Sequence, residues 1–215
     1  MQLLDIEGTV CPIGFVHETL FPYAFARLPE WVDARRDDPE VAAALARVTA
    51  LSGAVAPRDL LATLRSWMVA DAKLEPLKTL QGLVWADGWA RGELIAPFYP
   101  DVRTALEAWA AAGERVCVYS SGSVRAQRDV FGHTTAGDLR RYVAGWYDTR
   151  VGAKRDVASY LKIASAVAVA PDAVVFWSDV SAELDAARAA GMGTRLVVRE
   201  GPVPRSEHPV VEALS

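Results

Sequence analysis

The stretch Leu3-Leu4-Asp5-Ile6-Glu7-Gly8-Thr9 decides the fold class, because it joins a short apolar run to two acids and a glycine turn. An apolar run bounded by turn residues predicts a buried strand. Open α/β sheets bind their ligands at the carboxyl ends of such strands. Two carboxyl groups at that point can hold a cation, or divide the roles of nucleophile and proton carrier. A surface turn with two acids would look the same, so the rest of the chain has to decide.

Composition narrows the choice of class and location. The chain has 215 residues, 52% of them hydrophobic, and a formal net charge of −4. This length and hydrophobic fraction favour one domain with a complete hydrophobic core, or a core domain with an insertion, and argue against a disordered chain. The acidic balance without a basic cluster argues against a nucleic-acid partner. We see neither a segment of membrane-spanning length nor a signal pattern, so we expect no membrane association and a cytoplasmic location.

Cysteine and histidine give no sign of a metal or disulfide framework. The two cysteines, Cys11 and Cys117, are too few for a framework and lack zinc-type spacing. Cys117 lies between two valines and is expected to be a buried small hydrophobe. Cys11 follows the opening motif, but a nucleophilic role would need a base partner that the sequence does not reveal. The three histidines are scattered and form no ligand pair.

After the opening strand, the sequence predicts helices from residue 15 to residue 95. Apolar residues recur there at spacings of three and four, as on one face of a helix. Trp85 and Trp89 lie one turn apart, which favours core packing first and a substrate lid second. The segments with this periodicity are 41–48, 58–72 and 74–93. We therefore expect an all-helical cap domain at residues 15–95, inserted into a core formed by residues 1–14 and 96–215.

Beyond Pro97, apolar strands alternate with helices. Asp101 is expected to be the N-cap of the first of these helices. This alternation predicts an α/β fold with a doubly wound parallel sheet and right-handed crossovers. No G-x-G-x-x-G follows the first strand, which disfavours a dinucleotide fold. The tail from Gly201 is expected to be irregular. The predicted strands are 115–119, 146–148, 173–177 and 194–198, and the predicted helices 102–112, 124–131, 156–169 and a last one that ends near 190.

Polar groups follow three of these strands or precede a helix. Ser120 and Ser121 end a buried strand at the start of a helix, and we favour an anion site there over serine capping alone. Asp179 repeats the pattern of the opening motif. Lys154 precedes a helix and alone would be a solvated surface charge. Because parallel strands place their carboxyl ends at one edge, these groups are expected to converge with Asp5 and Glu7.

This set of residue types suits phosphoryl transfer. Three acids attract a divalent cation, most naturally Mg²⁺. The cation, a lysine and serine hydroxyls together would neutralise a phosphoryl group, and a carboxylate would attack phosphorus. Glu7, two residues after the expected nucleophile, is placed to protonate the leaving oxygen and then to activate water.

At this point the sequence resembles the haloacid dehalogenase-like hydrolases, whose four motifs match Asp5-Ile6-Glu7-Gly8-Thr9, Ser120 or Ser121, Lys154 and Ser178-Asp179 in order. The superfamily commonly has aspartate where this chain has Glu7. The form Asp-Ile-Glu-Gly-Thr is similar to that of the enolase-phosphatases of methionine salvage, the acireductone synthases. Departures from that family are Val10, where threonine is common, and the poorly matching residues 33–48. Further similar stretches are 21–23, 80–85, 92–94, 119–124, 131–134, 137–139 and 147–149.

The resemblance implies a magnesium-dependent phosphomonoester hydrolase with enolase activity. Its substrate would be 2,3-diketo-5-methylthiopentyl-1-phosphate, enolised and then dephosphorylated to the acireductone. Asp5 would be the nucleophile and a metal ligand, Glu7 the acid/base and a carbonyl ligand, and Asp179 would complete the metal site. Ser120 and Ser121 would bind substrate, and Lys154 its phosphate. For the enolisation base, Glu7 is only the nearest candidate.

Several alternatives remain open from the residues. A different capped phosphatase, acting on phosphoglycolate or a sugar phosphate, would carry the same motifs. A signalling phosphoacceptor also combines acids, a hydroxyl, a lysine and magnesium, but the insertion and the acid at Glu7 argue against it. A catalytically dead relative is disfavoured because every motif position holds a competent residue. Glu183 is equally compatible with holding Lys154 or a metal-bound water and with a first-turn dipole role. We expect a monomer.

Overall fold

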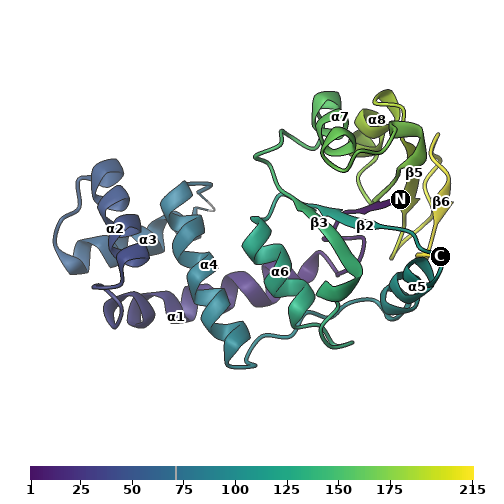
Figure 1. Cartoon of the computed structure of the whole chain (residues 1–215). Helices are drawn as coiled ribbons and strands as arrows, with labels where there is room; N and C mark the ends of the chain where they lie inside the picture. The colour runs from purple at the N-terminus through teal and green to yellow at the C-terminus, as the bar shows by residue number, and fades with distance from the viewer. Residues whose placement is uncertain (71) are drawn as a thin grey trace. The chain divides into compact units, whose positions relative to one another are not determined.

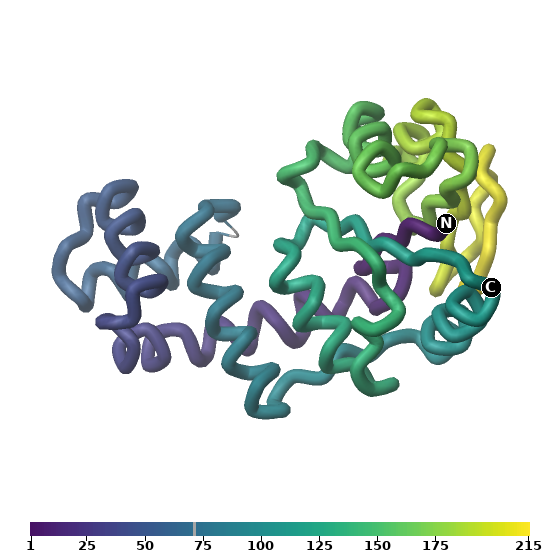
Figure 2. The backbone as a smooth tube through the Cα atoms, viewed as in Figure 1, coloured from purple at the N-terminus to yellow at the C-terminus, as the bar shows by residue number. Residues whose placement is uncertain are grey.

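The computed structural model describes residues 1–70 and 72–215. The chain divides into two compact units, a core of Met1–Phe15 with Ile95–Ser215 and a helical unit of Val16–Leu94. Both chain termini belong to the core unit (Figure 2). The helices in the described part of the chain lack the length and apolar character that a membrane span requires.

The core unit is built on a parallel sheet of six strands in the order β3-β2-β1-β4-β5-β6. β1 lies centrally and pairs in parallel with β2 and β4, so that Leu4 is opposite Val118 on one side and Trp177 on the other. This register brings the carboxyl ends of three neighbouring strands to the same level. The strands are β1 Gln2–Leu4, β2 Val116–Tyr119, β3 Val143–Tyr147, β4 Val175–Ser178, β5 Gly193–Val197 and β6 Val210–Val211.

Helices cover both faces of this sheet. α7 and α8 lie side by side on one face and α5 and α6 on the other (Figure 1). The predicted class, a doubly wound parallel α/β sheet with an inserted helical segment, is confirmed. The core helices are α5 Pro100–Ala111, α6 Val124–Gly132, α7 Val157–Ala166 and α8 Ser181–Ala189, with short 3₁₀ turns at Arg140–Tyr142 and Pro171–Ala173.

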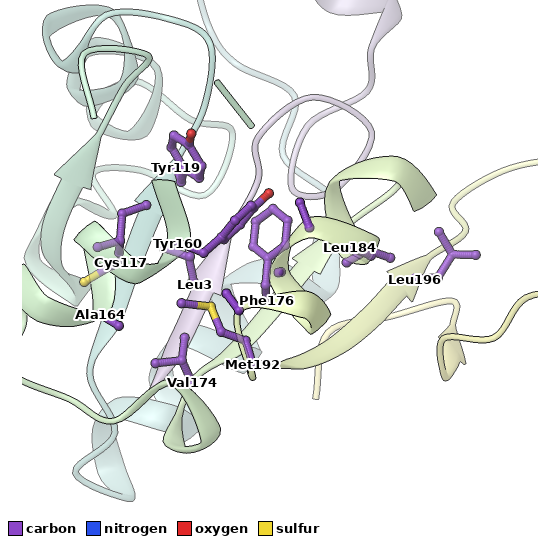
Figure 3. Packing of buried hydrophobic residues seen from close by; sticks show 14 residues of the cluster. Leu3, Cys117, Tyr119, Tyr160, Ala164, Val174, Phe176, Leu184, Met192 and Leu196 are labelled. Atoms are coloured by element: carbon purple, nitrogen blue, oxygen red, sulfur yellow. The ribbon is translucent and has the colours of Figure 1, made fainter. Parts of the chain in front are cut away.

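The main hydrophobic cluster fills the space between the sheet and α7 and α8. Leu3 of β1, Phe176 of β4 and Tyr160 of α7 are all fully buried in it (Figure 3). The ring centroids of Tyr160 and Phe176 lie 5.2 Å apart. Burying such large rings provides much of the hydrophobic stabilisation of a domain. The cluster therefore fixes the strands whose ends carry the motif residues.

The helical unit has its own core. Buried residues of α1, α2, α3 and α4 pack together, among them Leu28, Val48, Leu64 and Leu80. Trp85 is partly buried and its indole nitrogen donates to the carbonyl of Leu20 at 2.7 Å, a packing role. The helices are α1 Phe21–Asp33, α2 Pro39–Ser52, α3 Pro57–Val69 and α4 Glu75–Ala90, after a π-helical turn at Val16–Leu20. Residue 71, inside the predicted helix 58–72, lies outside the described residues.

Two local predictions were wrong. Asp101 is not an N-cap, because α5 begins one residue earlier at Pro100, and Tyr99 precedes it without a side-chain cap. The Asp101 carboxylate accepts hydrogen bonds from Arg199 at 2.8 and 2.9 Å and from the Leu214 backbone at 2.7 Å instead. The tail from Gly201 is not wholly irregular, because Val210–Val211 forms β6 on β5. A strand of two residues leaves no periodic pattern to detect.

Candidate active site

The motif residues converge at one edge of the core sheet. Asp5 follows β1, Ser120 follows β2 and Ser178 ends β4, and these three strands are neighbours. Asp5 is 3% exposed, and Ser120 and Ser178 are fully buried. Polar side chains are buried like this when they have partners within the protein. The pattern of strand ends thus brings together groups that are far apart in the sequence.

Lys154 bridges two carboxylates at the centre of the site. Its ammonium nitrogen lies 2.7 Å from Asp5 Oδ1 and 2.6 Å from Glu183 Oε2. Ser178 Oγ lies 3.2 Å from each of the same two carboxylates. Burial opposes the charge on Lys154, but the attraction of Asp5 and Glu183 prevails and raises the pKa of the ammonium group. Lys154 is therefore a cation held in a fixed position.

Glu7, two residues after Asp5, contacts the serine that follows β2. Ser120 Oγ donates to Glu7 Oε2 at 3.2 Å, and the Gly122 backbone donates to Ser120 Oγ at 3.2 Å. Burial and the nearby Asp5 carboxylate raise the pKa of Glu7 above its ordinary value. An acid whose pKa is shifted toward neutrality suits a group that gives up and regains a proton.

Asp179 approaches the opening motif from the end of β4. Gly8 has φ of +70°, and a β-carbon at Gly8 would overlap the carboxylate of Asp179. Glycine is thus required twice, for the left-handed backbone and for the close approach. Burial and the Asp5 charge raise the pKa of Asp179 to about 6. The negative charges of Asp5 and Asp179 therefore oppose each other in this site.

The serine-rich loop after β2 has mixed roles. Ser123 caps α6 by accepting a hydrogen bond from the Ala126 backbone at 3.2 Å. Ser120 faces Glu7, whereas Ser121 is exposed. Capping and a site-facing hydroxyl therefore coexist in the loop, carried by different serines.

The donor set fits a divalent cation. Four carboxyl groups interact in this site with one another and with Lys154, namely those of Asp5, Glu7, Asp179 and Glu183. Burial and the charge of Asp5 raise the pKa of Glu7, of Asp179 and of Glu183. A cation would relieve this excess of negative charge. Among the described residues, no three His, Cys, Asp or Glu side chains are arranged as a metal-binding group. The set expected from the sequence is compatible with this, because it takes two carboxylates and the backbone carbonyl of Glu7.

Cys11 is unsuited to act as a thiolate nucleophile. The residue is 2% exposed, and burial and the nearby Glu7 raise the pKa of its thiol to about 12. A neutral thiol is a poor nucleophile, so Cys11 is a packing residue.

Sequence reasoning left the role of Glu183 undecided. The structure shows it paired with Lys154 rather than only near the α8 N-terminus. Its position in the first turn of α8, shortly after the end of β4, was the available signal, because it places the carboxylate at the ligand-binding edge of the sheet. Tyr119, Ser159 and Tyr160, which contact the Lys154 loop, were not found by motif analysis.

Comparisons with known proteins agree on one family. Residues 3–191 match the model of the haloacid dehalogenase-like hydrolases. The chain is 49% identical to an enolase-phosphatase E1 from Gluconacetobacter diazotrophicus, over 99% of the chain and 90% of that protein. It is 48% identical to one from Acidiphilium cryptum, over 100% of the chain and 92% of that protein.

Solved structures extend this similarity to the fold. The UTR4 protein of Saccharomyces cerevisiae has a TM-score of 0.86 and 36% identity, with 100% of the chain and 97% of that protein covered. A dehalogenase structure, at 20% identity and a TM-score of 0.58, covers 99% of the chain and 92% of its own and supports the fold alone.

Proposed function

We propose that this chain, which belongs to the haloacid dehalogenase-like hydrolases and among them to the enolase-phosphatases, uses the site around Asp5 for its reaction. The resemblance seen in its motifs is confirmed by the family match and by relatives of nearly full length. The chain is therefore an enzyme, a phosphatase with enolase activity, that acts on a small phosphorylated substrate. Members of this family generally use a divalent metal.

The substrate that we propose is 2,3-diketo-5-methylthiopentyl-1-phosphate. The products are the acireductone 1,2-dihydroxy-3-keto-5-methylthiopentene and inorganic phosphate. The relatives' name supports both halves of this activity, the enolisation and the loss of phosphate. Glu7 is our candidate for the enolisation base.

The single observation that carries the assignment of the site is the convergence of Asp5, Lys154 and Glu183. A carboxylate within 2.7 Å of a buried ammonium group is placed to meet a phosphoryl group that the same cation attracts. An Asp5 oxygen attacks phosphorus, the bond from phosphorus to the ester oxygen breaks, and a phosphoaspartate forms. Glu7 gives its proton to the leaving oxygen.

The second half of the reaction returns the enzyme to its starting state. Glu7, now ionised, takes a proton from water while the water oxygen attacks the phosphorus of the phosphoaspartate. The bond from phosphorus to Asp5 breaks and inorganic phosphate leaves. Ser120 orients Glu7 through the 3.2 Å hydrogen bond and, with Ser121, would contact the substrate. Lys154 compensates the phosphoryl charge in both steps.

We propose Mg²⁺ as the metal, held by Asp5, Asp179 and the backbone carbonyl of Glu7. Oxygen donors of this kind are those that Mg²⁺ prefers. When bound, Mg²⁺ supplies charge neutralisation to the phosphoryl oxygens. A monomeric state and a cytoplasmic location stay predictions.

Phosphate release from the diketone phosphate, compared with a panel of simple phosphate esters, tests this function. We expect much faster release from the diketone phosphate, with an ultraviolet-absorbing enol formed before phosphate appears. Equal rates across the panel, with no enol, would favour a different phosphatase.

A further inference from the structure

The loop that carries Lys154 has four consecutive backbone carbonyls, at residues 151–154, and each accepts a hydrogen bond from a side chain. The loop itself is only partly buried, with Ala153 exposed, but a hydroxyl buried in the core has to find an acceptor within the protein. The four bonds are Lys162 Nζ to Val151 O at 3.0 Å, Tyr119 OH to Gly152 O at 2.9 Å, Ser159 Oγ to Ala153 O at 2.8 Å and Tyr160 OH to Lys154 O at 2.6 Å.

Three of these donors are hydroxyl groups of buried residues. Tyr119 and Tyr160 are fully buried and Ser159 is 1% exposed. The two tyrosine rings pack edge to face with centroids 5.6 Å apart. Figure 3 shows both hydroxyls directed away from the Val174 end of the cluster. Because the rings are fixed by core packing, their hydroxyls are fixed points for the loop.

The loop also lies directly against α7. Gly152 has φ of +145°, and a β-carbon there would overlap Ser159 Oγ. Only glycine permits both this backbone conformation and this approach. Residues 151–154 are therefore held in one position against the core, and Lys154 is the last of these four residues.

We propose that Tyr119, Ser159 and Tyr160 are positioning residues, which hold the Lys154 backbone so that its ammonium group stays between Asp5 and Glu183. Lysine carries its charge at the end of a flexible four-carbon stem, so its location depends on the anchor of its backbone. A shift of about 1 Å in a catalytic group can cost about 100-fold in rate. The inference rests on the proposed role of Lys154 in phosphate release.

The protonation of the two phenols is consistent with this role. Burial raises the pKa of Tyr119 and of Tyr160 above the ordinary tyrosine value. Both hydroxyls therefore remain donors throughout the neutral range, as the carbonyls require.

Tyr160→Phe tests the proposal with least disturbance, since it removes one hydroxyl and keeps the ring. We expect kcat for phosphate release to fall about tenfold and KM to rise, because the Lys154 charge is displaced in both ground and transition states. Tyr119→Phe and Ser159→Ala should act in the same direction. Tyr142→Phe, which removes a hydroxyl bonded to Glu107 away from the loop, is the matched control and should match wild type.

A core variant on the same helix shows what a loss of stability does to the kinetics when no hydroxyl is removed. Ile163→Val removes one buried methyl group from α7 and should lower Tm by a few degrees without changing kcat or KM. Tyr160→Phe should also have no further effect in a Lys154→Met background, because it acts through Lys154.

The outcomes separate the inference from the function on which it rests. Wild-type kcat and KM in Tyr160→Phe, or an equal fractional loss in the Lys154→Met background, would overturn the positioning role while leaving the proposed function in place. Wild-type activity in Lys154→Met would overturn the proposed role of the lysine itself. A drop in kcat that is absent from Ile163→Val and is lost in the Lys154→Met background supports the proposal.

Discussion

The Lys154 ammonium nitrogen lies 2.7 Å from Asp5 Oδ1, and this ion pair joins the first strand of the core to the loop before α7. The lysine side chain is 10% exposed and the aspartate side chain 4%. Breaking a buried pair by removing one partner leaves an uncompensated charge, so both residues are sensitive to substitution. The pair places a cation next to the expected nucleophile.

Lys154→Met should slow phosphate release by about 100- to 1000-fold and raise KM, because the charge that faces the phosphoryl group is lost. Steady-state kinetics with the diketone phosphate measure both effects. Lys78→Met, which removes an exposed lysine of α4, should change the rate far less. A Lys154→Met enzyme with wild-type KM would contradict phosphate binding by this residue.

Gly8→Ala should reduce activity by about 100-fold, since its β-carbon would push the Asp179 carboxylate out of place. Gly113→Ala is the matched control. Gly113 has φ of +73° with open space around it, so its alanine variant bears the same backbone strain away from the site. Activity assays of both variants, with Tm as a check on folding, give the comparison. Equal activities would show that backbone strain alone explains the effect.

Asp179→Asn should raise the Tm of the metal-free protein at pH 8, and it should remove the phosphate release that wild type shows with Mg²⁺. The pKa of Asp179 is about 6 in the fold, above its ordinary value, because burial and Asp5 oppose its charge. The ionised group therefore destabilises the fold fully above pH 6, and this cost disappears as the pH falls toward 4. The Tm difference between variant and wild type should shrink over that range.

Thermal unfolding in the presence of a chelator, from pH 4 to pH 8, measures this difference. Asp172→Asn, at an exposed position, should show no such trend. A metal-free Asp179→Asn protein that is less stable than wild type at pH 8 would contradict the repulsion between Asp179 and Asp5.

Ala168→Gly should stabilise the enzyme by about 0.5–1 kcal/mol without affecting catalysis. Ala168 follows α7 with φ of +53°, a left-handed conformation that costs alanine more than glycine. Differential scanning calorimetry should show a rise in Tm of about 1–4 °C. An unchanged or lower Tm would mean that the flexibility of the unfolded glycine chain outweighs the relief of strain.

The fold could be predicted from the sequence because the ends of strands and the turns after them are marked by a few consecutive residues. Asp5 after its apolar run and Asp179 after another indicated the edge of the sheet where the groups meet. The N-cap prediction for Asp101 was wrong because α5 already begins at Pro100. The Asp101 carboxylate instead accepts hydrogen bonds from Arg199, which is distant in the sequence. Such tertiary partners leave no local pattern.

The site could be predicted only as far as its motif residues. The pairing of Glu183 with Lys154 was one of two alternatives, and coordinates were needed to choose between them. The hydroxyl bonds of Tyr119 and Tyr160 to the Lys154 loop could not be foreseen, because a buried tyrosine in a strand or helix looks like any other core aromatic residue.

The most direct test of the central claim measures phosphate release from the diketone phosphate by wild type and Asp5→Asn, each with Mg²⁺ and with a chelator. We predict rapid release by wild type with Mg²⁺ only, and a loss of about a thousandfold or more in Asp5→Asn despite an unchanged fold. Rapid release by Asp5→Asn, or by wild type in the chelator, would contradict a metal-dependent reaction through Asp5.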